Sequence, residues 1–358
     1  MNRYRVAVIP GDGIGVDTID EALGALGAIC EVHGGLAIEY DRYPWGCGYY
    51  LEQGEMMPPD GLQILADYDC ILFGAVGFPP VPDHISLWGL LLPIRQHFDQ
   101  YINLRPVKLL DGIPGPLRDK GPEDIDFICI RENTEGEYAG TGGRIHRGQE
   151  NEVAIQTGVF TRAGVERVLR YAFDVAATRP RRQLASATKS NALQYSMVFW
   201  DEVFAALQKE YPQVACRQYH ADALAARMIT APESLDVVVG SNLFGDLLTD
   251  LGGALQGSLG IPPSGNINPT KRYPSLFEPV HGSAPDIAGQ GIANPIAAIW
   301  AASMMLDHLG HADAGDLLLR AINAVTAEGR TLTPDLGGSA TTREVGLAVQ
   351  EKVRLLGR

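Results

Sequence analysis

Short apolar runs alternate with longer amphipathic stretches along most of the chain. The strand-like runs are residues 4–9, 36–40, 70–74, 126–130 and 236–239. Apolar positions with helical spacing occupy about 14–32, 61–66, 163–178 and 195–211, and Thr161 is placed to cap the third of these helices. Because strands that alternate with helices pack as layers around a common core, this pattern predicts an α/β architecture.

Proline and glycine mark two irregular regions within this pattern. Prolines at 78–82 predict a loop, and Pro93 is expected to begin the helix that carries Arg95, since proline suits a first helical position. Glycines crowd residues 140–148, and a return strand is expected at 153–156. These residues predict a hairpin or a projecting arm.

A glycine-rich turn at Gly11-Asp12-Gly13-Ile14-Gly15 joins the first strand to the first helix. A dinucleotide-binding loop has a similar position, but the third glycine is missing at its usual place. The acidic residue expected about twenty positions later is only loosely matched. The pattern therefore favours a tight strand-to-helix turn over a standard Rossmann pyrophosphate loop.

The segment 241–252 follows a buried strand and carries Asp246 and Asp250. A spacing of four residues places both carboxylates on one face of a helix. Two like charges among leucines are tolerated best when a cation lies between them, and carboxylate oxygens favour Mg²⁺ or Mn²⁺. The alternative is a solvated acidic face of an ordinary helix, and this segment alone leaves both open.

Composition limits the classes of function. The chain has 358 residues, of which 46% are hydrophobic and 20% charged, as in a globular enzyme. A net charge of −14 argues against a nucleic acid or an anionic membrane as partner. Five scattered cysteines without C-x-x-C spacing indicate reduced thiols. An early strand leaves no room for a signal peptide and the longest apolar run, 296–306, is too short to cross a bilayer, so we expect a cytoplasmic protein.

Several polar residues near the ends of strand-like runs could carry chemistry. Arg95, Arg105 and Arg131 could each clamp a carboxylate through the planar guanidinium, although a single arginine is more often a surface or salt-bridging residue. Tyr138 and Lys189 are candidates for proton transfer, since a nearby cation can lower either pKa. Asp222 offers a third carboxylate, which could complete a metal site with Asp246 and Asp250. The loop 278–294 could bind a nucleotide or be a well-pinned turn.

Together these residues resemble the metal-dependent β-decarboxylating dehydrogenases, which include isopropylmalate, isocitrate, D-malate and tartrate dehydrogenases. The motifs that carry the resemblance cover essentially the whole chain: IPGDGIG at 9–15, NLRP at 103–106, RENTEGEY at 131–138, ATKSN at 187–191, NLFGDLLTDLG at 242–252 and EPVHGSAPDIAG at 278–289. The resemblance implies the two-domain fold of that family, with a large open mixed sheet that differs from a standard Rossmann domain.

The resemblance also implies roles for individual residues. It makes Arg95, Arg105 and Arg131 the carboxylate clamps and Tyr138 and Lys189 the acid–base pair. The metal ligands are then Asp222, Asp246 and Asp250. In this family the positions of Lys189 and Asp222 reach across from the neighbouring subunit, so the resemblance implies a homodimer with shared sites.

The loop 281–294 resembles the adenosine pocket of the family. The residues expected at the cofactor are His281, Gly282, Ser283, Ala284, Asp286 and Asn294. A carboxylate at Asp286 accepts a hydrogen bond from the ribose 2′-hydroxyl and repels a 2′-phosphate, which favours NAD over NADP. Whether a monovalent cation such as K⁺ assists is left open.

Substrate choice is expected in the segment before Arg95. Residues 82–88 are similar to the D-malate and tartrate subgroup, and Ser86 is expected to contact the substrate. Leu90 and Pro93 depart from that subgroup, where a serine and a lysine are expected, which makes the wall more apolar and removes a charge.

On the same basis we expect a cofactor-side domain of residues 1–105 plus 262–358. Residues 106–261 would form a domain for metal, substrate and dimerisation, with an arm near 137–157. The expected activity is NAD-dependent oxidation and decarboxylation of D-malate or tartrate with Mn²⁺ or Mg²⁺. One alternative is 3-isopropylmalate dehydrogenase. Another is a non-catalytic regulatory subunit of an isocitrate dehydrogenase, but such subunits are expected to lose the metal or proton-transfer residues that this chain keeps.

Overall fold

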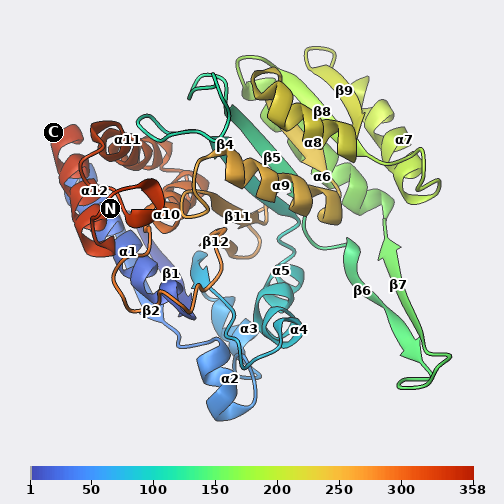
Figure 1. The fold of residues 1–358 in the computed structure, drawn as a ribbon, viewed down its shortest axis with the longest axis horizontal. Helices are drawn as coiled ribbons and strands as arrows, with labels where there is room; N and C mark the ends of the chain where they lie inside the picture. The colour runs from blue at the N-terminus through green and yellow to red at the C-terminus, as the bar shows by residue number, and fades with distance from the viewer. Residues whose placement is uncertain (1) are drawn as a thin grey trace. The chain divides into compact units, whose positions relative to one another are not determined.

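The computed structural model describes residues 2–358, which form two compact units (Figure 1). Unit 1 comprises the chain up to Gln100, Lys108–Pro122 and Gly253–Arg358. Unit 2 comprises Tyr101–Val107 and Glu123–Gly252. Each unit contains strands and helices that alternate along the chain, so the expected α/β class is confirmed.

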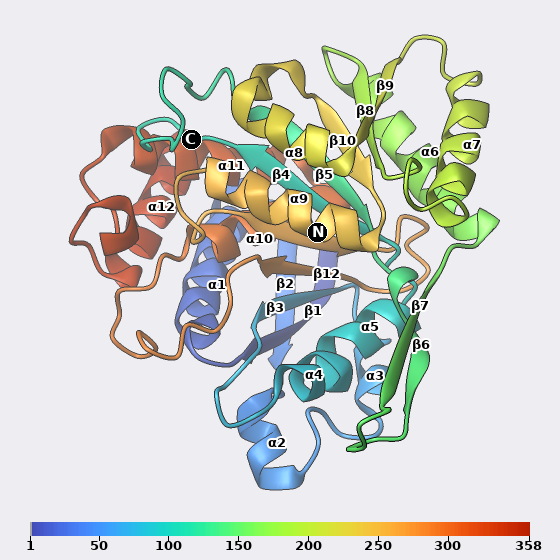
Figure 2. The same ribbon diagram turned by 45° about the vertical axis from the view of Figure 1, so that its right-hand side comes forward.

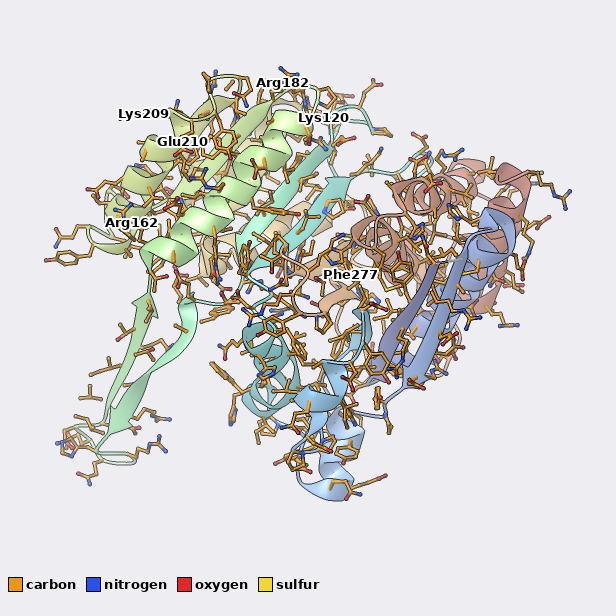
Figure 3. All side chains as sticks on the ribbon, turned by 180° about the vertical axis from the view of Figure 1, so that it is seen from behind. Lys120, Arg162, Arg182, Lys209, Glu210 and Phe277 are labelled. Carbon is orange, nitrogen blue, oxygen red and sulfur yellow. The ribbon has the colours of Figure 1, made fainter. Side chains whose placement is uncertain are left out.

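Unit 1 has its strands in the order β2-β1-β3-β12-β11. Their bounds are β2 (Leu36–Arg42), β1 (Asn2–Gly11), β3 (Cys70–Ala75), β12 (Ser275–Pro279) and β11 (Pro263–Ile267). The first four pair in parallel and β11 is antiparallel to β12, so the pairing is mixed. Every residue of β3 and β12 is buried, as expected of strands covered on both faces, and Phe277 of β12 lies within this interior (Figure 3).

The long helices of unit 1 are α1 (Ile14–His33), α10 (Ile296–His308), α11 (Ala312–Glu328) and α12 (Thr342–Leu356). Its short helices include α2 (Cys47–Gln53), α3 (Gly61–Leu65) and η3 (Pro334–Leu336). Helix α10 is buried along almost its whole length, whereas α12 buries one stripe and begins with a capping box between Thr341 and Glu344.

Unit 2 has its strands in the order β4-β5-β10-β8-β9. Their bounds are β4 (Ile102–Lys108), β5 (Asp126–Glu132), β10 (Val237–Gly240), β8 (Gln183–Thr188) and β9 (Ala215–His220). Helices α8 (Ala221–Thr230) and α9 (Asn242–Leu255) lie on one face of these strands (Figure 2), whereas α6 (Arg162–Thr178) and α7 (Ser196–Gln208) lie on the other (Figure 3). A short helix, η2 (Pro232–Ser234), precedes β10. The Thr161 hydroxyl accepts a hydrogen bond from the Gly164 N–H, so the expected N-cap of α6 is confirmed.

An antiparallel hairpin extends from unit 2 (Figure 1). It consists of β6 (Gly136–Ile145) and β7 (Val153–Val159). Its side chains are mostly exposed, including the apolar Ile145, Val153 and Ile155. Exposed apolar side chains on a projecting hairpin favour contact with another protein surface.

The loop expected at 78–82 is present, but the helix that carries Arg95 begins well before Pro93. The chain is helical from Asp83 to His97, as α4 (Asp83–Ser86), the π-helix η1 (Leu87–Leu91) and α5 (Leu92–His97). The Leu92 N–H donates to the Leu87 carbonyl, five residues back, and Pro93 has no N–H to donate. The wider turn therefore lets the helix pass through a proline that the local sequence predicts as its beginning.

The glycine turn at the start of α1 is occupied by protein backbone. The Ile14 N–H donates a 2.8 Å hydrogen bond to the Ser283 carbonyl, and a Cβ on Gly13 would lie 2.0 Å from that oxygen. The Asp12 carboxylate accepts hydrogen bonds from the N–H groups of Cys47 and Gly77. A carbonyl oxygen at this helix N-terminus takes the donor that a pyrophosphate would need, so the turn is not a standard Rossmann phosphate loop.

Among residues 2–358, no helix combines the length and the apolar composition that crossing a bilayer requires.

Candidate active site

Helix α9 presents Asp246 and Asp250 on one face. Both carboxylates reach Arg105 of β4: Nη1 lies 3.1 Å from Oδ1 of Asp250, and Nη2 lies 4.0 Å from Oδ1 of Asp246. The side chain of Asp246 is 30% exposed and that of Asp250 is 68% exposed, so solvent or a ligand can reach both. The spacing of four residues therefore produces the shared face that the sequence predicts.

Arg131 lies at the end of β5 and is almost fully buried beneath α9. Its Nε and Nη2 donate to Oδ1 of Asn242 at 3.0 and 2.7 Å, and Nη1 donates to Asp246. A Cβ on Gly245 would lie 2.6 Å from the Arg131 side chain, so glycine is needed for this close approach. The arrangement fixes a buried cation directly beside the acidic face of α9.

Tyr138 of β6 joins the same group. Its hydroxyl donates a 2.9 Å hydrogen bond to Oδ2 of Asp246, and the Arg131 guanidinium lies 5.3 Å from the centre of its ring. Burial and the negative charge of Asp246 raise the pKa of Tyr138, while the positive charge of Arg131 opposes them. The tyrosine is therefore held as a protonated donor next to a carboxylate.

Lys189 and Asp222 form a second group in unit 2. The Lys189 Nζ lies 2.6 Å from Oδ1 of Asp222, and this hydrogen bond lowers the pKa of the Asp222 carboxyl. Lys189 follows β8, and Asp222 lies in the first turn of α8. The three predicted metal ligands, Asp222, Asp246 and Asp250, do not cluster in one chain. Among residues 2–358, their carboxylate oxygens do not all lie within 4.8 Å of one another. Within one chain, Asp246 and Asp250 therefore form one group with Arg105, and Asp222 forms a separate pair with Lys189.

Arg95 and Ser86 lie in unit 1 and already have protein partners. Nη2 of Arg95 is 3.0 Å from Oε1 of Glu278, and both side chains are only 8% exposed. The Ser86 hydroxyl donates to the Asp83 carbonyl, and Ser86 is buried. Leu90 is fully buried in the apolar cluster of this unit, so its side chain packs against protein. Substrate contacts of Arg95 and Ser86 stay predictions.

The predicted cofactor loop follows β12 in unit 1. Nδ1 of His281 is 2.9 Å from the Gly282 carbonyl, and within the described chain its buried Nε2 has no hydrogen-bond partner. Burial lowers the pKa of His281, which favours a neutral ring. Asp286 is exposed, whereas the buried Asn294 donates to Asp335 at 3.0 Å and accepts from the Ile296 N–H.

The remaining predicted positions in this loop are backbone sites. Gly282 is exposed, and a Cβ on it would meet nothing within 4 Å. Ser283 is bound to Ile14 through its carbonyl, and Ala284 has a positive φ of 38°. An unpartnered imidazole nitrogen and an exposed carboxylate in one loop fit the adenosine half of a dinucleotide.

Three residues of the site were not given roles by the sequence. Asn242 accepts hydrogen bonds from Arg131. Thr249 accepts a 2.9 Å hydrogen bond from Nη1 of Arg105. Glu137 accepts a hydrogen bond from the Leu243 N–H at the start of α9. All three stand within the recognised motifs, and Glu137 and Thr249 directly precede residues that did receive roles. Their contacts bridge positions more than 100 residues apart, so no local spacing reveals them.

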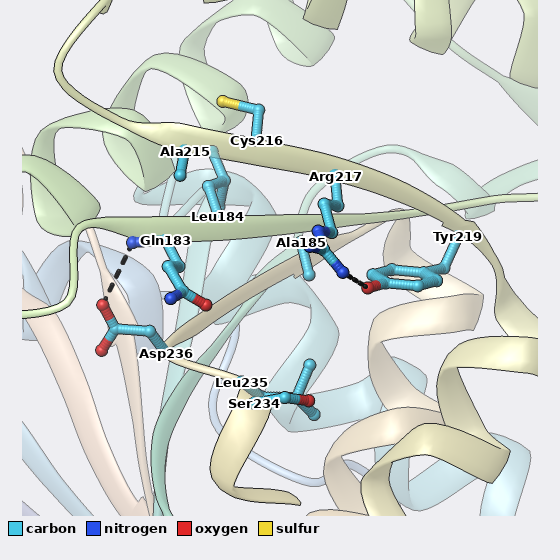
Figure 4. Close-up of a pocket in the computed structure, with 10 residues that line it drawn as sticks. All are labelled: Gln183, Leu184, Ala185, Ala215, Cys216, Arg217, Tyr219, Ser234, Leu235 and Asp236. Carbon is cyan, nitrogen blue, oxygen red and sulfur yellow. Dashed lines mark hydrogen bonds between the residues drawn. The ribbon is translucent and has the colours of Figure 1, made fainter. Parts of the chain in front are cut away.

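A separate small pocket lies between β8, β9 and the segment before β10 (Figure 4). Two hydrogen bonds join residues of its lining: the Gln183 N–H donates to Asp236, and Arg217 donates to the Tyr219 hydroxyl. None of the predicted site residues lines this pocket. Its contacts support the packing of these strands, so it does not compete with α9 as the candidate site.

Comparisons with known proteins agree with the motifs. The family model described as isocitrate/isopropylmalate dehydrogenase matches residues 5–349. D-malate dehydrogenase (decarboxylating) of Escherichia coli is 54% identical over 356 residues, which cover 98% of each chain. Tartrate dehydrogenase/decarboxylase of Pseudomonas putida is 51% identical over 363 residues, which cover 99% of each chain. These relatives confirm the resemblance to the tartrate and D-malate subgroup.

The crystal structure of isocitrate dehydrogenase from Methylococcus capsulatus has the same fold. Its TM-score is 0.88 at 34% identity, with 98% of this chain and 99% of that chain covered. The expected fold class, an α/β fold of this type distinct from a standard Rossmann domain, is confirmed. The chain belongs to the isocitrate/isopropylmalate dehydrogenase family.

Proposed function

We propose that this protein oxidises and decarboxylates D-malate or tartrate, with NAD as hydride acceptor and Mn²⁺ or Mg²⁺ as the required ion. The arrangement that carries the proposal is the acidic face of α9, on which Asp246 meets Arg131 and Tyr138. The activities named for the relatives that are more than 50% identical support the substrate class.

The residues of α9 fit a hard divalent cation. Asp246 and Asp250 supply carboxylate oxygens, which Mg²⁺ and Mn²⁺ prefer, and both are accessible. In the structure their charges are balanced by Arg105 and Arg131, so a cation that binds there must share these carboxylates with the arginines. When bound, such an ion withdraws electron density from the 2-hydroxyl and the adjacent carboxylate of the substrate.

The side chains of the protein then have distinct tasks. Arg105 and Arg131 bind and orient substrate carboxylates, to which Arg95 and Ser86 add contacts. Lys189 would accept the proton of the substrate 2-hydroxyl, directly or through water. NAD, when bound, would supply the acceptor for the hydride of the carbon that bears this hydroxyl. The product is a 2-oxo acid with a carboxylate β to its carbonyl, which can leave as CO₂. Tyr138 delivers a proton to the carbon from which CO₂ departs.

Two copies of the chain are part of the proposal. Lys189 and Asp222 form a pair of their own in one chain, so a complete site takes this pair from a second copy. The hairpin of β6 and β7, with exposed Ile145, Val153 and Ile155, supports such pairing. The protein is therefore proposed to act as a homodimer with shared sites.

NAD is the proposed cofactor because the loop after β12 carries an acidic residue. The exposed Asp286 carboxylate suits a ribose 2′-hydroxyl and repels a 2′-phosphate. His281, through its unpartnered Nε2, and Asn294 are proposed to lie near the adenine, with the backbone of Gly282, Ser283 and Ala284 beside the nucleotide.

The deciding experiment measures NADH formation with D-malate, tartrate and 3-isopropylmalate side by side, each with NAD and with NADP. Metal dependence is tested by removing ions with a chelator and restoring Mn²⁺ or Mg²⁺, with and without K⁺. We expect turnover with D-malate or tartrate, with NAD, and only after the divalent ion is restored. Preference for 3-isopropylmalate would overturn the substrate assignment, and the absence of turnover with every acid would indicate a regulatory subunit.

A further inference from the structure

Two histidines and an aspartate lie close together in unit 1, and none of them has a role in the proposed dehydrogenase reaction. His33 ends α1, His311 precedes α11, and Asp313 lies in the first turn of α11. One potential ligand atom from each side chain lies within 4.8 Å of the other two, and this is the only such group among residues 2–358. Nε2 of His33 is 2.9 Å from Oδ2 of Asp313, and the two imidazole rings are 5.5 Å apart, edge to face.

A tyrosine determines which nitrogen of His311 carries the proton. The hydroxyl of Tyr4 donates its single proton to the Leu309 carbonyl at 3.2 Å. Toward Nε2 of His311, at 3.1 Å, the same oxygen can therefore only accept, so Nε2 carries a hydrogen. In the neutral ring the lone pair is then on Nδ1 of His311, the nitrogen that could bind a metal. A hydrogen bond that fixes the tautomer in this way is the usual outer partner of a metal-binding histidine.

His33 has a protein partner for only one of its two ring nitrogens, since Nε2 faces Asp313. Its Nδ1 is buried and has no hydrogen-bond partner within the described chain, and its side chain is 21% exposed. Nε2 of His33, which faces Asp313, is therefore the ring nitrogen placed to reach an ion.

We propose that His33, His311 and Asp313 bind one zinc-class divalent ion. Nε2 of His33, Nδ1 of His311 and a carboxylate oxygen of Asp313 would be its ligands, with water in the fourth position. Two imidazoles and one carboxylate suit Zn²⁺ or Co²⁺ far better than Mg²⁺, which prefers oxygen. Asp313 is 76% exposed, so the site is open to ions from solution.

The ion would join the end of α1 to the beginning of α11. These elements are separated by 280 positions between His33 and Asp313, and binding only to the folded state stabilises that state by mass action. At a free Zn²⁺ concentration one hundred times the dissociation constant, the unfolding equilibrium constant falls about 100-fold. The role is structural and independent of the proposed Mn²⁺ or Mg²⁺ site.

The alternative is an ion pair that matches the helix dipoles, with His33 at the C-terminus of α1 and Asp313 at the N-terminus of α11. The two models differ in their need for a metal. The full-length protein, freed of metal by a chelator and kept in excess Mg²⁺, is titrated with Zn²⁺ by calorimetry. It is also titrated with Co²⁺, whose visible absorption reports nitrogen ligands in a four-coordinate site.

We expect one equivalent to bind, with a rise in melting temperature. Asp313→Asn should weaken binding about 100-fold or more, since loss of even an outer partner costs about 10- to 100-fold. Asp316→Asn, the same change at an exposed site on α11, should bind like the parent protein. Asp246→Asn should also retain this equivalent, which separates it from the proposed catalytic metal. No binding by the parent protein, equal binding by both α11 variants, or loss of the equivalent in Asp246→Asn would overturn the proposal.

Discussion

The hydroxyl of Tyr138 donates a 2.9 Å hydrogen bond to Asp246. This one hydrogen bond connects the proposed proton donor directly with a proposed metal ligand. Because Asp246 also receives Arg131, the tyrosine, the carboxylate and the arginine form one continuous group at the start of the arm and the middle of α9. A substitution of Tyr138 can therefore remove the hydroxyl proton while the contact between Asp246 and Arg131 remains.

Tyr138→Phe should abolish most of the turnover and leave the fold intact. The ring remains, and one lost hydrogen bond costs only about 1 kcal/mol of stability. Loss of a positioned proton donor typically lowers the rate about 100-fold or more. The rate of NADH formation with D-malate or tartrate measures the effect, and Tyr219→Phe, which also removes a tyrosine hydroxyl from unit 2, is the control. Turnover near the parent rate would refute the role of Tyr138.

Lys189→Ala should cut turnover by about 100-fold or more while NAD still binds. The variant removes the group proposed to accept the hydroxyl proton, and the cofactor loop lies in unit 1, far along the chain. The pair with Asp222 is exposed to solvent, so its loss should leave the stability of the fold nearly unchanged.

Steady-state rates and a separate NAD-binding titration check this prediction for Lys189. Lys209→Ala removes a lysine at the end of α7 and serves as the control (Figure 3). A variant that loses NAD binding together with turnover would indicate a general defect in folding or assembly. It would not support proton transfer by Lys189.

Asp286→Asn should weaken the preference for NAD over NADP. A hydrogen bond from the ribose hydroxyl to a carboxylate is worth about 1.5–3 kcal/mol, so kcat/KM with NAD should fall roughly 10- to 100-fold. Use of NADP should fall less or improve, because the repulsion of its 2′-phosphate is removed. The ratio of kcat/KM values is the measurement, and Asp60→Asn, an exposed aspartate before α3, is the control. An unchanged ratio would place the ribose elsewhere.

Local patterns predict the elements whose structure is determined locally. The strand at β10 is completely buried, so its apolar run stands out in the sequence. Thr161 is recognisable as a cap because its side chain bonds to a residue three positions later. Asp246 and Asp250 are assigned to one face from helical spacing alone. In each case the interaction that matters spans only a few residues.

Features that depend on distant residues cannot be predicted in this way. The π-helix before Arg95 buries Leu90 and Leu91 in a cluster built from other parts of unit 1, and Pro93 alone predicts a different boundary. Arg95 is paired with Glu278, 183 positions away. The N–H of Ile14 at the start of α1 is likewise taken by the carbonyl of Ser283, nearly 270 residues later in the chain, and is not free for a phosphate.

His308 should make stability depend on pH in mildly acidic solution. Burial, together with the positive charge of Lys271, lowers the pKa of His308 from about 6.5 to about 4. Between about pH 6.5 and pH 4, His308 therefore binds a proton in the unfolded chain but stays neutral in the folded chain. The stability contributed by the neutral ring is complete above pH 6.5, is lost as the pH falls toward 4, and amounts to at most about 3 kcal/mol.

Urea unfolding between about pH 7 and pH 5 tests this prediction. His308→Gln should remove one titrating group and so reduce the slope of unfolding free energy against pH by up to about 1.4 kcal/mol per unit. Lys271→Met should act in the same direction by a smaller amount, because losing the lysine charge raises the pKa of His308. NMR titration of the His308 ring gives that pKa directly. If His308→Gln keeps the full slope of the parent protein, other groups determine the acid sensitivity and the buried ring does not.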